Sequence, residues 1–183
     1  MRKTAATRRT DLVTLLSSIF PIDPAPLPRN PTALSHLLFA IHSLPLPNSA
    51  YPPSLSDDII SSALGYVAQV VAMLSGYLGV PLNYPIRLQG SRSAILDLIS
   101  MMKGPRAFPL YARGVERYRF DYAVFLLNKN IEQLMYVRGV GVADLRNTLP
   151  NLKTLLLGLS WDEAREQVTS WLGRVGWLAR ALG

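Results

Sequence analysis

The chain has 183 residues, of which 49% are hydrophobic and 17% charged, so it is large enough for one domain with a real core and is not a disordered chain. It contains no cysteine, which excludes a disulfide scaffold and thiol chemistry and fits a reducing compartment. The formal net charge is +7. A basic surface of this kind attracts anionic lipid or nucleic acid, unless it is simply a solvated basic surface.

The first 34 residues predict a helix followed by a linker. The apolar stripe of a short amphipathic helix over residues 1–20 consists of Leu12, Leu15, Leu16 and Ile19. Five prolines between residues 21 and 31 then predict a stiff linker. Residues 36–44 predict a strand, on which His36 and His42 would lie about 20 Å apart. That is too far for the two histidines to share a metal ion, and no cofactor is predicted.

No charged residue occurs between Ile59 and Ile86, a stretch long enough to span a bilayer. However, serines, a glutamine and glycines interrupt it, and two prolines prevent helix beyond residue 80. The pattern predicts a helix from Asp57 to about Leu78. We interpret it as a buried central helix rather than a transmembrane span.

An apolar-Pro-Leu triplet recurs at residues 44–46, 80–82 and 108–110, which indicates strand–helix units that are used more than once. Residues 84–89 and 93–99 predict an antiparallel hairpin joined at Gly90 and Ser91. The expected fold class is therefore α+β, a β-α repeated domain with small antiparallel sheets packed against helices.

The segment from residue 118 to residue 157 is the most informative part of the chain. It predicts a helix that is apolar nearly all round and ends at Gly139. Three amides, Asn128, Asn130 and Gln133, interrupt its core-like face. A buried amide needs a hydrogen-bond partner, so we predict that these three are structural and bond to the backbone of a neighbouring loop.

A second helix is predicted after the glycines, from Asp144 as its cap to about Leu157. Pro150 falls inside this helix and predicts a kink or a split near Leu149.

These two helices read FDYAVFLLNKNIEQLMYVRGVGVADLRNTLPNLKTLL, and the run resembles the C-terminal domain of UVRAG-type subunits of the class III phosphatidylinositol 3-kinase complex. The resemblance extends upstream through LPNS at residues 46–49, ALGY at 63–66, VPLNYPI at 80–86, GSRS at 90–93 and FPLY at 108–111. It is closer to the UVRAG type than to the related autophagosome-specific subunit.

The resemblance implies a BARA-like β-α repeat domain over residues 35–183. Residues 1–34 would then be the end of a coiled-coil helix and its proline-rich linker. It also implies a non-catalytic scaffold that pairs with a Beclin-like subunit of the lipid-kinase complex. Such a scaffold would be cytoplasmic and peripheral on endosomal, vacuolar or autophagic membranes.

Basic residues outnumber acidic residues by seven to two between residues 87 and 119. Together with the resemblance, this predicts contact with an anionic membrane, with loop tips near residues 101, 102 and 108 as hydrophobic inserts. The candidates are Arg87, Arg92, Met101, Met102, Lys103, Arg106, Phe108 and Arg113. Nucleic acid is not the expected partner, because the chain has no zinc-finger spacing, RNA-binding aromatic signature or recognition-helix pattern.

Residues 160–183 predict a C-terminal amphipathic helix that opens with a capping box at Ser160–Glu163. This helix either docks on the domain core or serves as an interfacial or partner-binding helix. The partner-helix candidates are Trp161, Trp171 and Trp177. The alternative function is accordingly a protein-interaction module that binds a regulator through this helix, without direct lipid contact.

Catalytic patterns do not occur in the sequence. There is no Gly-x-Ser-x-Gly elbow, phosphate-binding Walker loop or His-Glu-x-x-His zinc motif. No pair of carboxylates has a spacing suited to acid–base chemistry. We therefore expect no enzymatic activity.

Overall fold

A computed structural model of the chain describes residues 5–25, 39–48, 51–52, 55–101 and 103–160. Along these residues, three short antiparallel strands followed by a long helix occur twice. The first unit is β1 (Ile22–Pro24), β2 (Phe39–Ile41), β3 (Leu44–Leu46) and α2 (Asp57–Leu78). The second is β4 (Ile86–Arg87), β5 (Ala94–Leu96), β6 (Ala107–Pro109) and α3 (Arg117–Val137). The predicted α+β fold with repeated β-α units is confirmed.

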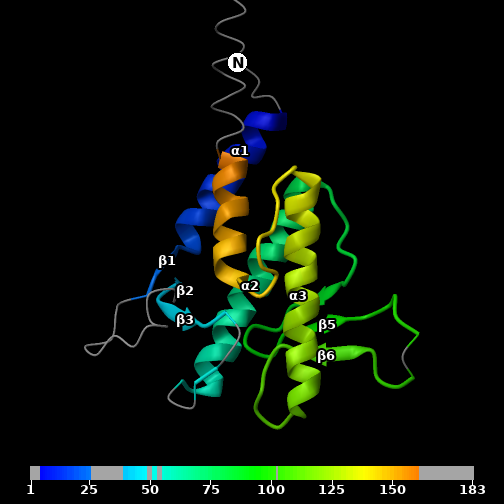
Figure 1. Ribbon diagram of the computed structural model, residues 1–183. Helices are drawn as coiled ribbons and strands as arrows, with labels where there is room; N and C mark the ends of the chain where they lie inside the picture. The colour runs from blue at the N-terminus through cyan, green and yellow to red at the C-terminus, as the bar shows by residue number, and fades with distance from the viewer. Residues whose placement is uncertain (1–4, 26–38, 49–50, 53–54, 102, 161–183) are drawn as a thin grey trace, which may run out of the picture.

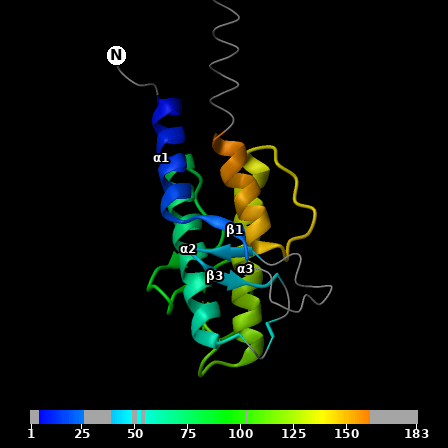
Figure 2. The same ribbon diagram turned by 90° about the vertical axis from the view of Figure 1, so that its left-hand side faces the viewer.

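Two helices complete the fold. Helix α1 (Ala5–Ile19) precedes the first unit, and residues 148–160 form a helix after the second. Figures 1 and 2 show the long helices side by side, with the second sheet at the flank of α3. Buried side chains from all of these elements except β4 form one hydrophobic core, and the partly buried Ile86 of β4 packs against it.

The first sheet contains a hairpin where the sequence predicted a single strand over residues 36–44. Strands β2 and β3 pair with Ile41 opposite Leu44, and the two residues between them have positive φ angles, 50° for His42 and 66° for Ser43. Two consecutive positive φ angles make the tight turn whose twist suits antiparallel strands. The predicted strand is therefore wrong at its end, because the chain reverses at His42. His36 lies outside the described residues.

Helix α2 forms the centre of the core. The Ser56 side chain accepts a hydrogen bond from the backbone N–H of Asp58 at its start, and Gly79 ends it in the left-handed conformation. These bounds match the predicted helix. Helix α2 is long and apolar enough to cross a membrane, but 56% of its most apolar window is buried inside the protein. Its lack of charge follows from contacts with α1, α3 and the first sheet.

The second unit touches α2 through a close backbone approach at Gly65. A Cβ atom at this position would overlap the carbonyl group of Gly90, in the turn between β4 and β5. The helix and the turn can lie this close only because residue 65 has no side chain.

The N-terminal helix presents a different face to the core from the one predicted. Val13 and Leu16 are 0% and 1% exposed, whereas Leu12, Leu15 and Ile19 are 40%, 55% and 48% exposed. Only Leu16 of the predicted stripe is buried, because α1 packs on α2 through the neighbouring flank, which carries Val13 and Leu16. The predicted linker also starts too early, since residues 22–24 pair with β2 as strand β1.

The helix of residues 148–160 corrects three predictions. Asp144 accepts a hydrogen bond from the backbone N–H of Arg146 in a turn before the helix, so it does not cap it. Pro150 lies in the first helical turn, where proline is tolerated, and the predicted kink is absent from residues 148–160. Ser160 is still helical and donates to the Leu156 carbonyl, so it does not open a new helix.

Candidate functional site

The three amides of α3 make hydrogen bonds to two neighbouring segments. Asn130 is fully buried and bonds the backbone of Tyr84 through both its oxygen and its nitrogen. Gln133 accepts from the Asn83 backbone N–H at 2.9 Å and donates to the Pro81 carbonyl at 2.8 Å. Both side chains hold the loop that connects α2 to β4.

Asn128 differs from the other two amides in its partner. Its oxygen accepts a hydrogen bond from the Thr148 hydroxyl at 2.8 Å, and both side chains are buried. It therefore joins α3 to the helix of residues 148–160 rather than to a loop backbone. With their hydrogen bonds made inside the protein, the three amides are structural candidates rather than ligand-binding ones.

The loop of residues 97–106, between β5 and β6, is held at its base by Asp97. This carboxylate is 1% exposed and accepts hydrogen bonds from the Ile99 and Ser100 backbone N–H groups, the Ser100 hydroxyl and the Tyr122 hydroxyl. Burial alone would raise the pKa of Asp97, but the hydrogen bonds outweigh it and lower the pKa to about 2. Asp97 therefore stays charged and fixes the loop as it leaves β5.

Beyond Asp97 the loop exposes three large apolar side chains, which we call the apolar tip. Leu98, Ile99 and Met101 are 57%, 60% and 99% exposed. In Figure 1 this loop extends away from the helices. Exposed apolar groups that cluster on one loop are typical of a contact site for a membrane or a partner.

The membrane-contact candidates of the sequence analysis fall into different places. Met101 belongs to the apolar tip, and Met102 lies outside the described residues. The expectation that Phe108 is an insert at a loop tip is wrong. Phe108 lies in β6 and is 2% exposed, because its ring packs edge-on against Tyr122 at 4.7 Å and under the Arg119 guanidinium.

Two of the basic candidates, Lys103 and Arg106, lie on the loop that carries the apolar tip, whereas Arg87 lies in β4 and Arg92 in the turn between β4 and β5. Among the described residues, no carboxylate lies within ion-pair distance of Arg87, Arg92, Lys103 or Arg106, and all four are exposed. Arg113 is different, since it lies 3.8 Å from Asp58 at the start of α2. Four positive charges are therefore free to meet anionic groups.

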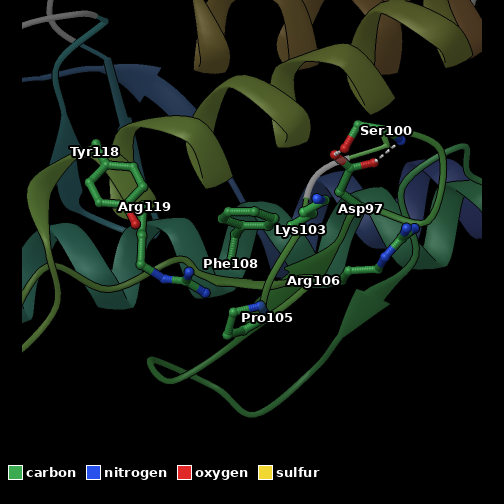
Figure 3. Close-up of a pocket in the computed structure, with 8 residues that line it drawn as sticks. All are labelled: Asp97, Ser100, Lys103, Pro105, Arg106, Phe108, Tyr118 and Arg119. Carbon is green, nitrogen blue, oxygen red and sulfur yellow. Dashed lines mark hydrogen bonds between the residues drawn. The ribbon is translucent and has the colours of Figure 1, made fainter.

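Two hollows lie on the second unit, and only the smaller one is lined by residues of this loop. Figure 3 shows the smaller one, about 110 Å³, whose lining includes Lys103 and Arg106 from the loop and Arg119 from α3. The larger one, about 430 Å³, lies over β5 and β6 and shares Arg119 with it. We call this larger hollow the arginine groove, because Arg87, Arg92 and Arg119 line it.

Sequence reasoning missed three residues of this surface. Leu98 and Ile99 are the last residues of the strand predicted over residues 93–99. In the sequence analysis Asp97 counts only as one of the two acidic residues between residues 87 and 119. The spacing of Asp97 and Ser100 is typical of a side chain that caps the turn after it, and this signal could have identified the loop. No group of three or more His, Asp or Glu side chains in the described residues could hold a metal ion.

Trp161, Trp171 and Trp177 lie outside the described residues, so the structure gives no account of the predicted partner helix.

Comparison with known proteins identifies the family. A model of the family described as vacuolar sorting 38 and autophagy-related subunit 14 matches residues 1–115, more than half of the chain. The chain belongs to this family. The match runs from α1 through the second sheet, so it includes the apolar tip and two arginines of the groove.

Individual relatives agree with this vacuolar sorting 38 and autophagy-related subunit 14 family. The mouse UV radiation resistance-associated protein is 46% identical over 151 residues, which is 81% of this chain and 20% of that protein. Vacuolar protein sorting-associated protein 38 of Schizosaccharomyces pombe is 33% identical over 144 residues, 79% of this chain and 28% of that protein. The UV radiation resistance-associated gene protein of Drosophila melanogaster is 35% identical over 122 residues, 66% of this chain and 17% of that protein. The chain thus spans less than a third of the length of these relatives.

Proposed function

We propose that this chain is a non-catalytic scaffold domain of a class III phosphatidylinositol 3-kinase complex. In this role it pairs with a Beclin-like subunit and promotes peripheral association with endosomal, vacuolar or autophagic membranes from the cytoplasm. Membership of the vacuolar sorting 38 and autophagy-related subunit 14 family supports the complex and the pathway. The geometry of the second unit supports the membrane contact.

The observation that carries the membrane proposal is the apolar tip on a loop that also carries Lys103 and Arg106, two basic side chains without an acidic partner among the described residues. Moving apolar groups into the acyl boundary of a bilayer lowers the free energy, and each Lys or Arg near an anionic surface contributes about 1 kcal/mol to binding. Three inserted side chains are worth about 3–6 kcal/mol. Neither contribution alone gives stable binding, so their position on one loop and its neighbouring sheet is the significant feature.

The pairing proposal rests on the outer face of α1. Leu12, Leu15 and Ile19 are spaced three and four residues apart, which is the spacing of a coiled-coil seam, and all three are exposed. The neighbouring flank of α1, with Val13 and Leu16, is already buried, and α1 contacts α2. A second helix could therefore pack on this seam without disturbing the core. Two turns bury little area, so α1 alone supports only weak pairing.

A vesicle flotation experiment tests the membrane contact. The 183-residue chain is floated with phosphatidylcholine vesicles that contain phosphatidylserine. Replacing Leu98, Ile99 and Met101 by Ser should abolish co-flotation without lowering the melting temperature, because these side chains make few contacts inside the protein. A second variant changes Arg87, Arg92, Lys103 and Arg106 to Glu. Equal flotation of this variant and the wild type would refute the basic surface as the contact.

The matched control is Leu157→Ser, which removes another exposed apolar side chain, 51% exposed, from the helix of residues 148–160. Its flotation should equal that of the wild type. A similar loss in the control would mean that general surface hydrophobicity drives binding, and the assignment to the apolar tip would be wrong.

A further inference from the structure

The arginine groove is a hollow, whereas a surface that only attracts anions could be flat. Its floor consists of small side chains from the two paired strands, Ala94 of β5 and Ala107 and Pro109 of β6. Large side chains at these positions would fill the hollow. Its volume, about 430 Å³, lies within the range of small-molecule sites, about 300–1,000 Å³. The groove is open to solvent on one side, and its volume is large enough to take up part of a ligand.

The walls of the groove bring together three guanidinium groups from separate elements. Arg87 comes from β4, Arg92 from the turn after it and Arg119 from α3. None of them has a carboxylate within ion-pair distance among the described residues. Guanidinium groups bind phosphate oxygens in pairs, with fixed geometry. The groove thus has three guanidinium groups in its lining that can donate hydrogen bonds to a phosphate monoester.

Two of these arginines are held in place before any ligand arrives. The Arg119 side chain donates to the Ala107 carbonyl at 2.7 Å, and its guanidinium lies 4.9 Å from the centre of the Phe108 ring. The Arg92 guanidinium lies 5.7 Å from the centre of the Tyr111 ring. Such contacts reduce the entropy that the side chains lose on binding. They favour selective recognition over a general attraction.

We propose that the arginine groove binds the phosphorylated headgroup of an inositol phospholipid, so that this face selects phosphoinositides over other anionic lipids. The inference rests on the membrane contact proposed above. The groove shares Arg119 with the hollow beneath the loop that carries the apolar tip. The groove therefore adjoins the hollow beside this loop, so a membrane that the loop enters would bring its headgroups to the same side of the second sheet, which is why the proposed occupant is a lipid.

One lining residue opposes this ligand. Glu116 is the acidic side chain of the groove, and it precedes α3 without making a capping hydrogen bond. A carboxylate at the rim repels a phosphate and weakens its binding. Removing this charge should strengthen headgroup binding, whereas removing an arginine of the same groove should weaken it.

The experiment compares vesicles of equal surface charge. Phosphatidylcholine vesicles carry either phosphatidylserine or phosphatidylinositol 3-phosphate, and the affinity of the 183-residue chain is measured for both. Charged hydrogen bonds in the groove should make the phosphoinositide affinity about tenfold higher. Arg87→Ala and Arg92→Ala should each remove most of this difference, and Glu116→Gln should increase it. Arg113→Ala, which lies outside the groove lining, should leave the ratio unchanged.

Each result decides between the proposals. Equal affinity for the two vesicles would overturn headgroup selection but leave the membrane contact standing. No binding to either vesicle would refute the membrane contact itself and this inference with it. A third outcome is that the chain binds a phosphorylated peptide, loses this binding in Arg87→Ala and shows no preference between the two vesicles. That outcome would assign the groove to a protein partner instead. Circular dichroism and melting temperatures of the variants verify that each one is folded.

Discussion

Asn130 pairs with both backbone polar groups of a single residue, Tyr84. The Tyr84 N–H donates to Asn130 Oδ1 at 3.1 Å, and Asn130 Nδ2 donates to the Tyr84 carbonyl at 2.7 Å. The side-chain amide thus supplies the acceptor and the donor that the backbone of a neighbouring strand would otherwise provide. This arrangement fixes the chain just before β4, the strand that carries Arg87 of the groove.

Replacing Asn130 should destabilise the domain strongly. Asn130→Leu leaves the N–H and the carbonyl of Tyr84 without partners, and each unsatisfied buried group costs about 1–3 kcal/mol. We expect a loss of about 3 kcal/mol in the free energy of unfolding, measured by urea denaturation. The control is Gln133→Leu, which removes similar bonds from a half-buried position where water can replace them. An equal loss in both variants would contradict the role of burial.

The bond between Asn128 and Thr148 predicts a coupled pair. Asn128→Leu leaves the Thr148 hydroxyl without its acceptor and should cost about 1–3 kcal/mol. In the double variant with Thr148→Val neither polar group remains, so part of the stability should return. A double-mutant cycle by chemical denaturation measures this coupling. Strict additivity of the two single changes would show that the bond contributes nothing.

Gly65 predicts a substitution that is costly for reasons of space alone. Gly65→Ala places a methyl group against the Gly90 backbone, so α2 and the turn must separate, at a cost of about 1–3 kcal/mol. Gly76→Ala in the same helix meets no atom within 4 Å and should raise stability by up to about 1 kcal/mol. Thermal unfolding of the two variants distinguishes them, and shifts in the same direction would refute the close approach.

The lowered pKa of Asp97 predicts a dependence of stability on pH. In the folded chain the pKa is about 2, below the ordinary value of about 4. Asp97 therefore stabilises the folded state fully above about pH 4, and this contribution is lost as the pH falls toward 2. Asp97→Asn should cost about 2 kcal/mol at neutral pH, with a smaller difference from the wild type in acid.

Urea denaturation at several pH values between about 7 and 3 measures this change. The control is Asp121→Asn, which removes an exposed ion pair with Arg117 and should cost well under about 1 kcal/mol. A difference between Asp97→Asn and the wild type that stays constant with pH would show that the hydrogen bonds, rather than the charge, carry the effect.

The two faces of α1 predict opposite responses in stability and in pairing. Leu16→Ala removes a buried side chain and should cost about 2–5 kcal/mol of unfolding free energy. Leu15→Ala, at an exposed position, should change stability by no more than about 0.5 kcal/mol. When both variants are folded, only Leu15→Ala should weaken the pull-down of a Beclin-like subunit. Unchanged pairing would exclude this face as the seam.

Periodicity and capping signals in the sequence were sufficient for the long elements. Helix α2 has its predicted bounds because Ser56 and Gly79 act locally, within one turn of each end. The β4–β5 pairing followed from a turn signal between two short apolar runs. The amide partners of Asn130 and Gln133 were predicted as loop backbone because a buried amide needs a donor and an acceptor nearby, whatever the fold.

The contacts of the site were decided by the tertiary structure. Phe108 and Met101 are both apolar residues near one loop, yet one is 2% and the other 99% exposed. Which face of α1 is buried depends on where α2 lies, so Leu16 is buried whereas Leu12, Leu15 and Ile19 are exposed. The groove needs Arg119 of α3 beside Arg87 of β4, residues that no local pattern connects. Sequence by itself determined the elements and the family, because these depend on short-range patterns, whereas exposure and convergence depend on how distant elements pack.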